Sequence, residues 1–349
     1  MQERKLVFFQ GNTQYENTGD VLINKSFIVL IKKYAQLIIN DKEMPDWYVA
    51  SLGLTKEECI SDRGSHFYLY LAGKALMSRL GVAKNTVYLI GGAPGHEFGS
   101  SVSKAVKNFI IAILYFILRV CGVQIFRLGF SIGPIGKAVG VSEKFRSVFM
   151  NQYFVRDSLS LSLCHQIGIN KARFFPDLAW LYQPNRTTSF TKNKIVLSFR
   201  HSVLDESSDG QYLERLKANL FFMLQSVSEK YSIEVLYQVK RDLEFCGKLY
   251  DELKNVMPVT FRQEQVTLET AEAAYGGACC ILTNRLHVAL LGYKYGGLPL
   301  ILTDSESHLK IKGIYTDAGM GYLLLDVNNG IEKNAHDFNG LLQNRDDII

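Results

Sequence analysis

The chain has 349 residues, of which 47% are hydrophobic and 21% charged, and its formal net charge is +5. This length favours about two domains, and the composition is that of a globular enzyme rather than a disordered or fibrous chain. The small excess of positive charge suits anionic small molecules or an anionic membrane surface, and it is too dispersed to indicate a nucleic-acid-binding protein.

The six cysteines show neither a CxxC pair nor the spacing of metal ligands, and several lie in apolar stretches. We therefore expect buried, reduced thiols. The first ten residues, MQERKLVFFQ, lack the pattern of a secretory signal. Together these features predict a cytoplasmic protein.

The first predicted strand covers residues 5–9 and runs through a loop into a predicted helix. Asp20 has the type and the position of a helix N-cap. The alternative is a binding loop at a strand end, formed by Gly11, Asn12, Gly19 and Asp20. This loop lacks the GxGxxG pattern and so does not indicate a dinucleotide. The helix has a predicted apolar face of Ile23, Phe27, Leu30, Ile31 and Tyr34.

Two glycine-rich segments, residues 91–99 and 129–134, each follow a predicted strand. Glycines such as Gly92 let a ligand approach the backbone closely, although a plain connection is the alternative for the first segment. The second segment, which contains Ser131, has the glycines and the proline of a rigid loop at a strand end.

Residues 104–120 form the most apolar stretch of the chain. The stretch is shorter than the ~20 residues that span a bilayer, and Arg119 interrupts it. Two interpretations follow. The predicted helix is either buried between the sheet and a neighbouring element, or it lies in a membrane interface with Lys104, Lys107 and Arg119 at the lipid headgroups.

Arg156 and Asp157 follow another predicted strand, and Asp157 or Ser158 is expected to cap the helix after it. Further along, Asp177 lies in a Pro-Asp-Leu-Ala segment. Arg156 and Asp177 either form an internal ion pair or contact a substrate.

The polar, proline-containing segment of residues 183–193 has no periodicity and predicts a domain linker. It separates a predicted N-terminal domain, residues 1–185, from a C-terminal domain, residues 190–349. Strands and helices alternate on both sides of it. This pattern predicts an α/β fold with two Rossmann-like domains facing across a cleft, which is a GT-B-like architecture.

Three predicted strands of the second half each deliver basic groups at their ends, namely Arg200 and His201, Lys240 and Arg241, and Arg285 and His287. The carboxyl ends of parallel strands meet at one edge of a sheet, and ligands bind there. Arg285 and His287 lie at a helix start and point the same way, with Leu286 turned inward. A guanidinium beside an imidazole suits a phosphorylated or carboxylated substrate that needs a proton moved. The alternative is an Arg285 paired with a carboxylate and a His287 that only caps the helix.

The stretch Thr283-Asn284-Arg285-Leu286-His287, followed by Gly297-Leu298-Pro299, resembles the Ser-x-Arg-Leu-His and Gly-x-Pro motifs of the polysaccharide pyruvyl transferase family. Here Thr283 stands in the place of the serine. Other segments resemble the family's motifs in the same order, from about residue 5 to residue 325: the Gly11 to Asp20 loop, Gly91-Gly92, residues 129–134, Arg156-Asp157, residues 176–179 and residues 310–313.

The resemblance implies a transferase that moves a pyruvyl group from phosphoenolpyruvate to hydroxyls of a sugar in a surface or capsular polysaccharide precursor, releasing phosphate. It implies an acceptor site in the N-terminal domain and a phosphoenolpyruvate site in the C-terminal domain. Lipid linkage of the acceptor would place the enzyme at the inner face of the cytoplasmic membrane, with residues 104–120 as a peripheral contact. No cofactor other than the donor substrate is implied, and no cluster with ligand spacing suggests a metal.

This chemistry assigns roles to the basic residues. Cations must hold the carboxylate and the departing phosphate, which we expect of Arg200, Arg285 and either Lys240 or Arg241. His287 is the candidate acid, and Asp20 or His201 is the candidate base. The remaining predicted substrate-binding residues are Asn12, Gly92, Ser131, Arg156 and Lys312.

Two other functions stay open. A glycosyltransferase of the same shape would use a nucleotide sugar and would need a carboxylate for the ribose, for which Glu264 and Glu269 are candidates. An inactive family member would act as a membrane-peripheral partner in polysaccharide assembly, although Arg285 and His287 argue against this function.

Overall fold

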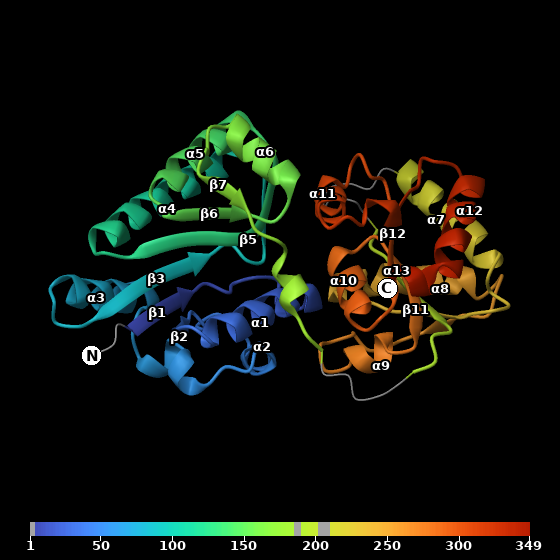
Figure 1. Ribbon diagram of the computed structural model, residues 1–349, viewed down its shortest axis with the longest axis horizontal. Coiled ribbons are helices and arrows are strands. Elements are labelled where there is room, and N and C mark those ends of the chain that lie inside the picture. Colours follow the sequence, from blue (N-terminus) through green and yellow to red (C-terminus); the bar gives the residue numbers. More distant parts are fainter. Residues whose placement is uncertain (1–3, 185–189, 202–209) are drawn as a thin grey trace. The chain divides into compact units, whose positions relative to one another are not determined.

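The chain forms two compact α/β units (Figure 1), and the computed structural model describes residues 4–184, 190–201 and 210–349. Unit 1 comprises Met1–Tyr15 and Asp20–Leu181, and unit 2 comprises Glu16–Gly19 and Tyr182–Ile349. Residues 185–189 of the predicted linker lie outside the described residues. The short segment Glu16–Gly19, which the sequence places in the N-terminal domain, therefore groups with unit 2.

Unit 1 is built on a parallel sheet with the strand order β2-β1-β3-β5-β6-β7, and β4 pairs with the second half of β5. The strands are β1 Arg4–Phe9, β2 Gln36–Ile39, β3 Asn85–Gly91, β4 Gly95–Gly99, β5 Gln124–Ile135, β6 Gln152–Val155 and β7 Ala172–Phe174. The α-helices are α1 Thr18–Lys32, α2 Asp46–Ser51, α3 Phe67–Arg79, α4 Val102–Val120, α5 Lys137–Val148 and α6 Ser158–Gln166.

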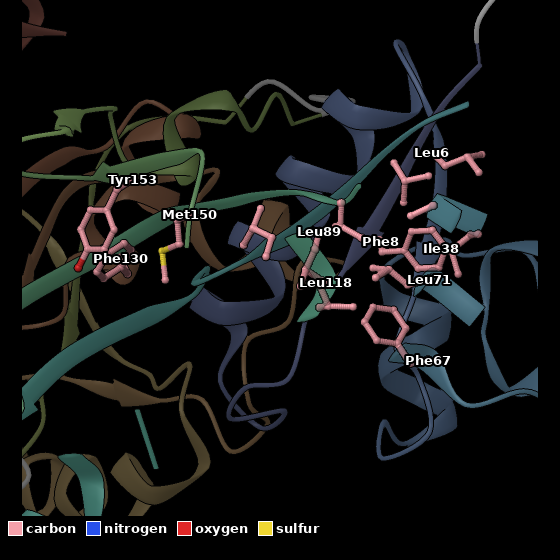
Figure 2. Close-up of a cluster of buried hydrophobic side chains, with 14 of the residues drawn as sticks. Leu6, Phe8, Ile38, Phe67, Leu71, Leu89, Leu118, Phe130, Met150 and Tyr153 are labelled. Atoms are coloured by element: carbon pink, nitrogen blue, oxygen red, sulfur yellow. The ribbon is translucent and has the colours of Figure 1, made fainter. Parts of the chain in front are cut away.

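The core of unit 1 follows from the alternation of side chains along its strands. Phe8 of β1 belongs to a cluster that includes Phe67 and Leu71 of α3 and extends to Tyr153 of β6 (Figure 2). The next residue, Phe9, points to the other face, where its ring centroid lies 4.6 Å from that of Phe27 in α1. Helices therefore cover both faces of the sheet, which explains why its strands read as apolar runs.

The first turn of α1 differs from the prediction. The helix begins at Thr18, and the side chain of the preceding Asn17 accepts a hydrogen bond from the Gly19 N–H at 3.0 Å. Asp20 therefore lies in the first turn and is not the N-cap. The helix ends at Lys32, and Tyr34, which was predicted to face inward, is 69% exposed.

The segment of residues 129–134, predicted as a rigid loop, is instead the second half of the long strand β5. Its first half pairs with β3, and its second half pairs with β4, a short strand that the sequence pattern did not predict. Gly129 and Gly133 have φ values of +73° and +110°, which permits a bend in the strand as it changes partners.

Helix α4 is buried on one side only. Ala105, Asn108, Ala112 and Leu118 are buried, while large apolar residues on the opposite side are exposed. The interpretation of α4 as a buried helix therefore explains its buried side but not the apolar residues exposed on its other side. Among the residues that the structure describes, none of the helices combines the length and the apolar character needed to cross a bilayer.

Unit 2 contains a second parallel sheet, with the order β10-β9-β8-β11-β12-β13 among its described residues. The strands are β8 Lys194–Ser198, β9 Ser232–Val235, β10 Thr260–Phe261, β11 Ala278–Thr283, β12 Leu298–Thr303 and β13 Leu324–Asp326. The α-helices are α7 Gly210–Gln225, α8 Leu243–Leu253, α9 Ala271–Tyr275, α10 Leu286–Lys294, α11 Leu309–Asp317, α12 Ile331–Gln343 and α13 Arg345–Ile348. Strands β11 and β12 are buried along their whole length, as expected for central parallel strands. The six cysteines of the chain are free thiols, and all but Cys121 are buried.

Two carboxylates and two guanidinium groups are buried together in unit 1. Glu97 of β4 pairs with Arg127 of β5 at 2.8 Å and with Arg146 of α5 at 2.9 Å, and Glu143 pairs with the same two arginines. Burial alone would raise the pKa of Glu97, but Arg127 and Arg146 outweigh it and lower the pKa to about 2. This cluster ties α5 to the outer half of the sheet.

The cluster predicts an acid-dependent loss of stability. Glu97 has a pKa of about 2 in the folded chain against an ordinary value of 4.5, so its contribution is full above pH 4.5 and is lost as the pH falls towards 2. We expect Glu97→Gln to lower the free energy of unfolding by about 3–5 kcal/mol at neutral pH, because it leaves buried guanidinium charge uncompensated. The variant should also lose less stability than the wild type between pH 4.5 and 2.

Thermal and urea unfolding at stepped pH values measure both effects. Glu229→Gln, at an exposed position, is the matched control and should leave stability almost unchanged. Equal unfolding midpoints for Glu97→Gln and the wild type would contradict the prediction.

Candidate functional site

The carboxyl ends of the two central strands of unit 2 are joined by one buried side chain. Asn284, directly after β11, accepts a hydrogen bond from the Arg200 N–H at 2.8 Å and donates one to the Arg200 carbonyl at 2.9 Å. Its amide also donates to the Tyr212 hydroxyl at 3.1 Å. Arg200 and Arg285 therefore leave the sheet at the same edge, as the strand pattern predicted.

Three guanidinium groups gather around one carboxylate at this edge. Arg285 is the N-cap residue of α10 and donates from Nη2 to Oδ1 of Asp242, which is 4% exposed. Burial raises the pKa of Asp242, while the charges of Arg285, Arg241 and Arg200 act in the opposite direction. Guanidinium groups gathered at a sheet edge favour an anionic ligand.

The guanidinium of Arg200 contacts a histidine that the sequence analysis did not select. Nη2 of Arg200 lies 2.6 Å from Nε2 of His308, and Nδ1 of His308 lies 3.0 Å from the hydroxyl of Thr303. Because a guanidinium only donates, Nε2 must accept, and the proton of a neutral imidazole then sits on Nδ1. His308 is 5% exposed, so this contact with Arg200 is made away from solvent.

His287 occupies the first turn of α10, two residues after Arg285. Leu286 between them is 4% exposed, and Arg285 and His287 are both partly exposed, which confirms the predicted alternation. Backbone N–H groups in the first turn of a helix have no acceptor within the helix, which suits the binding of an anion. A Cβ atom at Gly19 would lie 2.6 Å from Cβ of His287 and 2.7 Å from its Nδ1. Only glycine fits against this imidazole.

The other basic residues predicted in unit 2 are more exposed. Lys240 forms an ion pair with Glu16 at 2.9 Å, and Lys312 forms one with Glu306 at 2.6 Å. The ring of His201 packs edge-on against Phe245 with a centroid distance of 5.9 Å. Of the pair Lys240 and Arg241, it is Arg241 whose charge acts on Asp242.

Ser131 and Arg156 of unit 1 lie in a closed internal network. Arg156 donates to the Ser131 hydroxyl at 2.9 Å, to Asp177 at 2.9 Å and to the Gly95 carbonyl at 3.1 Å. Ser131 in turn donates to Asp157 at 2.7 Å. The ion pair of Arg156 and Asp177, one of the two alternatives from the sequence, is present. Both Arg156 and Ser131 are 2% exposed, so this geometry favours a structural role for them.

Three further candidate residues also belong to unit 1. Asp20 is buried and accepts a hydrogen bond from the Thr13 hydroxyl. Asn12 is exposed and donates to Glu43 at 3.3 Å. Gly92 has a φ of +106°, and a Cβ there would lie 2.9 Å from the Leu128 carbonyl oxygen, so backbone packing by itself requires glycine.

Sequence reasoning missed Asn284, Asp242 and His308. Asn284 and Asp242 were within reach, because both follow predicted strands and adjoin selected basic residues. His308 follows Thr303 by five positions, and only the fold brings its ring to Arg200. In the described part of the chain, no group of three or more His, Cys, Asp or Glu side chains could hold a metal ion.

Comparison with known sequences identifies one family. The sequence model of the family described as polysaccharide pyruvyl transferase matches residues 17–297. No curated protein sequence gives a significant match to the chain.

Solved structures share the fold at low sequence identity. UDP-GlcNAc 2-epimerase from Neisseria meningitidis, bound to UDP-GlcNAc, has a TM-score of 0.55 and 11% identity over 97% of this chain and 91% of that chain. The UDP-GlcNAc 2-epimerase of Methanocaldococcus jannaschii has a TM-score of 0.56 and 12% identity over 96% and 92%. Staphylococcus aureus MnaA with UDP has a TM-score of 0.51 and 9% identity over 98% and 88%. These likenesses confirm the predicted GT-B-type α/β fold and concern the fold alone.

The contact between Gly19 and His287 can be tested by adding one methyl group. We expect Gly19→Ala to lower the free energy of unfolding by about 1–3 kcal/mol, since the new Cβ overlaps the imidazole. Gly247→Ala in α8 is the matched control. It has open space at its Cβ and should raise stability by about 0.5–1 kcal/mol. Thermal unfolding should show a lower midpoint for Gly19→Ala and a higher midpoint for Gly247→Ala than for the wild type. A higher midpoint for Gly19→Ala would refute the contact.

The contact between Arg200 and His308 predicts an effect on anion binding. His308→Phe keeps a ring but removes the acceptor of Arg200, and we expect the affinity for inorganic phosphate to fall about tenfold. Thr303→Val removes the partner of Nδ1 and a longer contact with the Tyr212 hydroxyl at 3.4 Å, leaves the acceptor Nε2 in place, and should have a smaller effect. Isothermal titration calorimetry with phosphate measures both, and unchanged affinity in His308→Phe would show that the ring does not position Arg200.

Proposed function

Because the chain belongs to the polysaccharide pyruvyl transferase family, we propose that it transfers the pyruvyl group of phosphoenolpyruvate to hydroxyls of a sugar in a surface or capsular polysaccharide precursor. The observation that supports this donor is the gathering of three guanidinium groups, those of Arg200, Arg241 and Arg285, around Asp242. Phosphoenolpyruvate carries a carboxylate and a phosphate, and guanidinium groups bind both in a planar, bidentate manner.

The proposed reaction has definite proton requirements. A proton adds to C3 of phosphoenolpyruvate, which turns C2 into an electrophile. One sugar hydroxyl attacks C2, the bond between C2 and the phosphate oxygen breaks, and a second hydroxyl completes the ketal. Of the two hydroxyl protons released, one balances the proton added to C3 and the other leaves with phosphate. The reaction therefore needs an acid, a base and cations, and it needs no redox partner.

We assign the binding and acid roles to residues at the carboxyl ends of the unit 2 strands. Arg200 and Arg285, together with Arg241, hold the carboxylate and the departing phosphate. His287, in the first turn of α10 beside Arg285, is the acid. Asp20 and His201 remain the two candidates for the base. Lys240, which is paired with Glu16, is a weaker candidate for phosphate than Arg241.

The proposal also names the substrates and the cellular location of the reaction. Phosphoenolpyruvate is the donor substrate, with no additional cofactor or metal. The acceptor is a glycan, and a lipid-linked form of it would bring the enzyme to the inner face of the cytoplasmic membrane. Unit 1 supplies the acceptor side and unit 2 the phosphoenolpyruvate side.

Ligand-dependent thermal stability tests the donor. Phosphoenolpyruvate at 100 times its dissociation constant should stabilise the wild type by about 2.7 kcal/mol. Arg285→Ala should abolish this shift. Arg285→Lys keeps a positive charge beside Asp242, so it should stay folded and still show a reduced shift because it lacks the guanidinium fork. Arg173→Ala, at an exposed position of unit 1, should bind like the wild type.

A panel of nucleotide sugars in the same assay separates the alternatives. Stabilisation by a nucleotide sugar, with none by phosphoenolpyruvate, would replace the proposal with glycosyl transfer. Stabilisation by phosphoenolpyruvate without release of phosphate in the presence of acceptor glycans would indicate an inactive partner in polysaccharide assembly.

A further inference from the structure

Unit 1 carries a broad exposed apolar surface, which we call the α4–α5 face. Eight large apolar side chains of α4 are exposed, and Ile110, Ile113 and Ile117 have exposed fractions of 62%, 59% and 51%. Three more are exposed on α5, including Phe145, whose ring lies 5.4 Å from that of Phe109. Figure 1 shows the two helices side by side in unit 1. A contiguous apolar surface of this kind marks an interaction site.

The spacing of these residues makes α4 an amphipathic helix rather than a spanning one. Val106, Ile110, Ile113 and Ile117 recur at three and four positions and so share one side of the helix. The opposite side is fixed to the protein, where the buried Asn108 donates to Ser142 of α5 at 3.3 Å. Only one side of α4, which is roughly 28 Å long, can therefore meet a partner.

The exposed charges on the two helices are all positive. Lys107 and Arg119 of α4 and Lys137 and Lys144 of α5 are exposed. The helices contain one acidic residue, Glu143, which is 0% exposed and paired with Arg127 and Arg146. An apolar face with basic residues around it and no exposed carboxylate complements an anionic lipid surface. A second copy of the chain would instead bring like charges together.

We propose that the α4–α5 face docks on an anionic lipid bilayer, with α4 lying in the plane of the interface. The apolar side chains enter the headgroup and acyl boundary, and the lysines and Arg119 pair with lipid phosphates. The proposal stands on exposure and charge and does not depend on the reaction catalysed.

Vesicle flotation with the full chain tests the proposal. The wild type should float with phosphatidylcholine vesicles that contain phosphatidylglycerol, bind pure phosphatidylcholine vesicles much less, and detach as the salt concentration rises. The triple variant Ile110→Gln, Ile113→Gln, Ile117→Gln should lose at least about tenfold in bound fraction. Lys107→Glu with Lys144→Glu should abolish the preference for anionic vesicles.

The control replaces exposed apolar residues elsewhere, with Val256→Gln and Phe222→Gln in unit 2, and should bind vesicles like the wild type. Equal flotation of the wild type and the triple variant, or no flotation of the wild type, would overturn the proposal. Sedimentation velocity tests the alternative that the face binds a second copy of the chain. That alternative would hold if the wild type were a dimer that binds no vesicles and the triple variant were a monomer. The shift in thermal stability caused by phosphoenolpyruvate, measured on the same variants, tests the proposed function independently of vesicle binding.

Discussion

The hydrogen bonds between Asn284 and the backbone of Arg200 are the constraint on which the candidate site depends. Strands β8 and β11 stop pairing at Ser198 and Thr283, and the Asn284 amide continues the pairing beyond them as a peptide group would. Asn284 is fully buried, so these bonds are made away from water, where leaving them unmade is costly. They bring Arg200 and Arg285, which are far apart in the sequence, to one edge of one sheet.

Both units place arginine and aspartate side chains near the carboxyl ends of their strands. In unit 1, Arg156 lies after β6 within reach of Asp177 and of the Ser131 hydroxyl, and its positive charge is neutralised inside the protein. In unit 2, the charges of three guanidinium groups act on Asp242. An arginine paired with an aspartate is therefore closed inside the protein in unit 1 and lies beside further guanidinium groups in unit 2.

The fold class could be predicted because parallel strands covered by helices on both faces consist of long runs of apolar residues. The strand ends of unit 2, and with them Arg200 and Arg285, followed from the same signal. Local signals were less reliable. The glycines at 129 and 133 indicated a loop, but hydrogen bonds to β4 and β6 hold this segment as a strand. His308 and Arg200 are 108 positions apart in the sequence, and a periodic pattern of apolar residues does not predict a contact over that separation.

The assignment of Glu16–Gly19 to unit 2 has a consequence for dividing the protein into fragments. Within that unit, the Thr18 hydroxyl donates to the Val266 carbonyl at 2.7 Å, and the Thr18 N–H donates to the Gln238 carbonyl at 3.2 Å. A fragment that starts at Tyr182 would lack these residues. The Val266 carbonyl would lose its Thr18 donor, and the Gln238 carbonyl would keep only the hydrogen bond from the Gln265 side chain at 2.8 Å. Chimeras that exchange C-terminal halves between family members would have to exchange residues 16–19 as well. Unit 2 consists of two stretches that are separate in the sequence, residues 16–19 and 182–349.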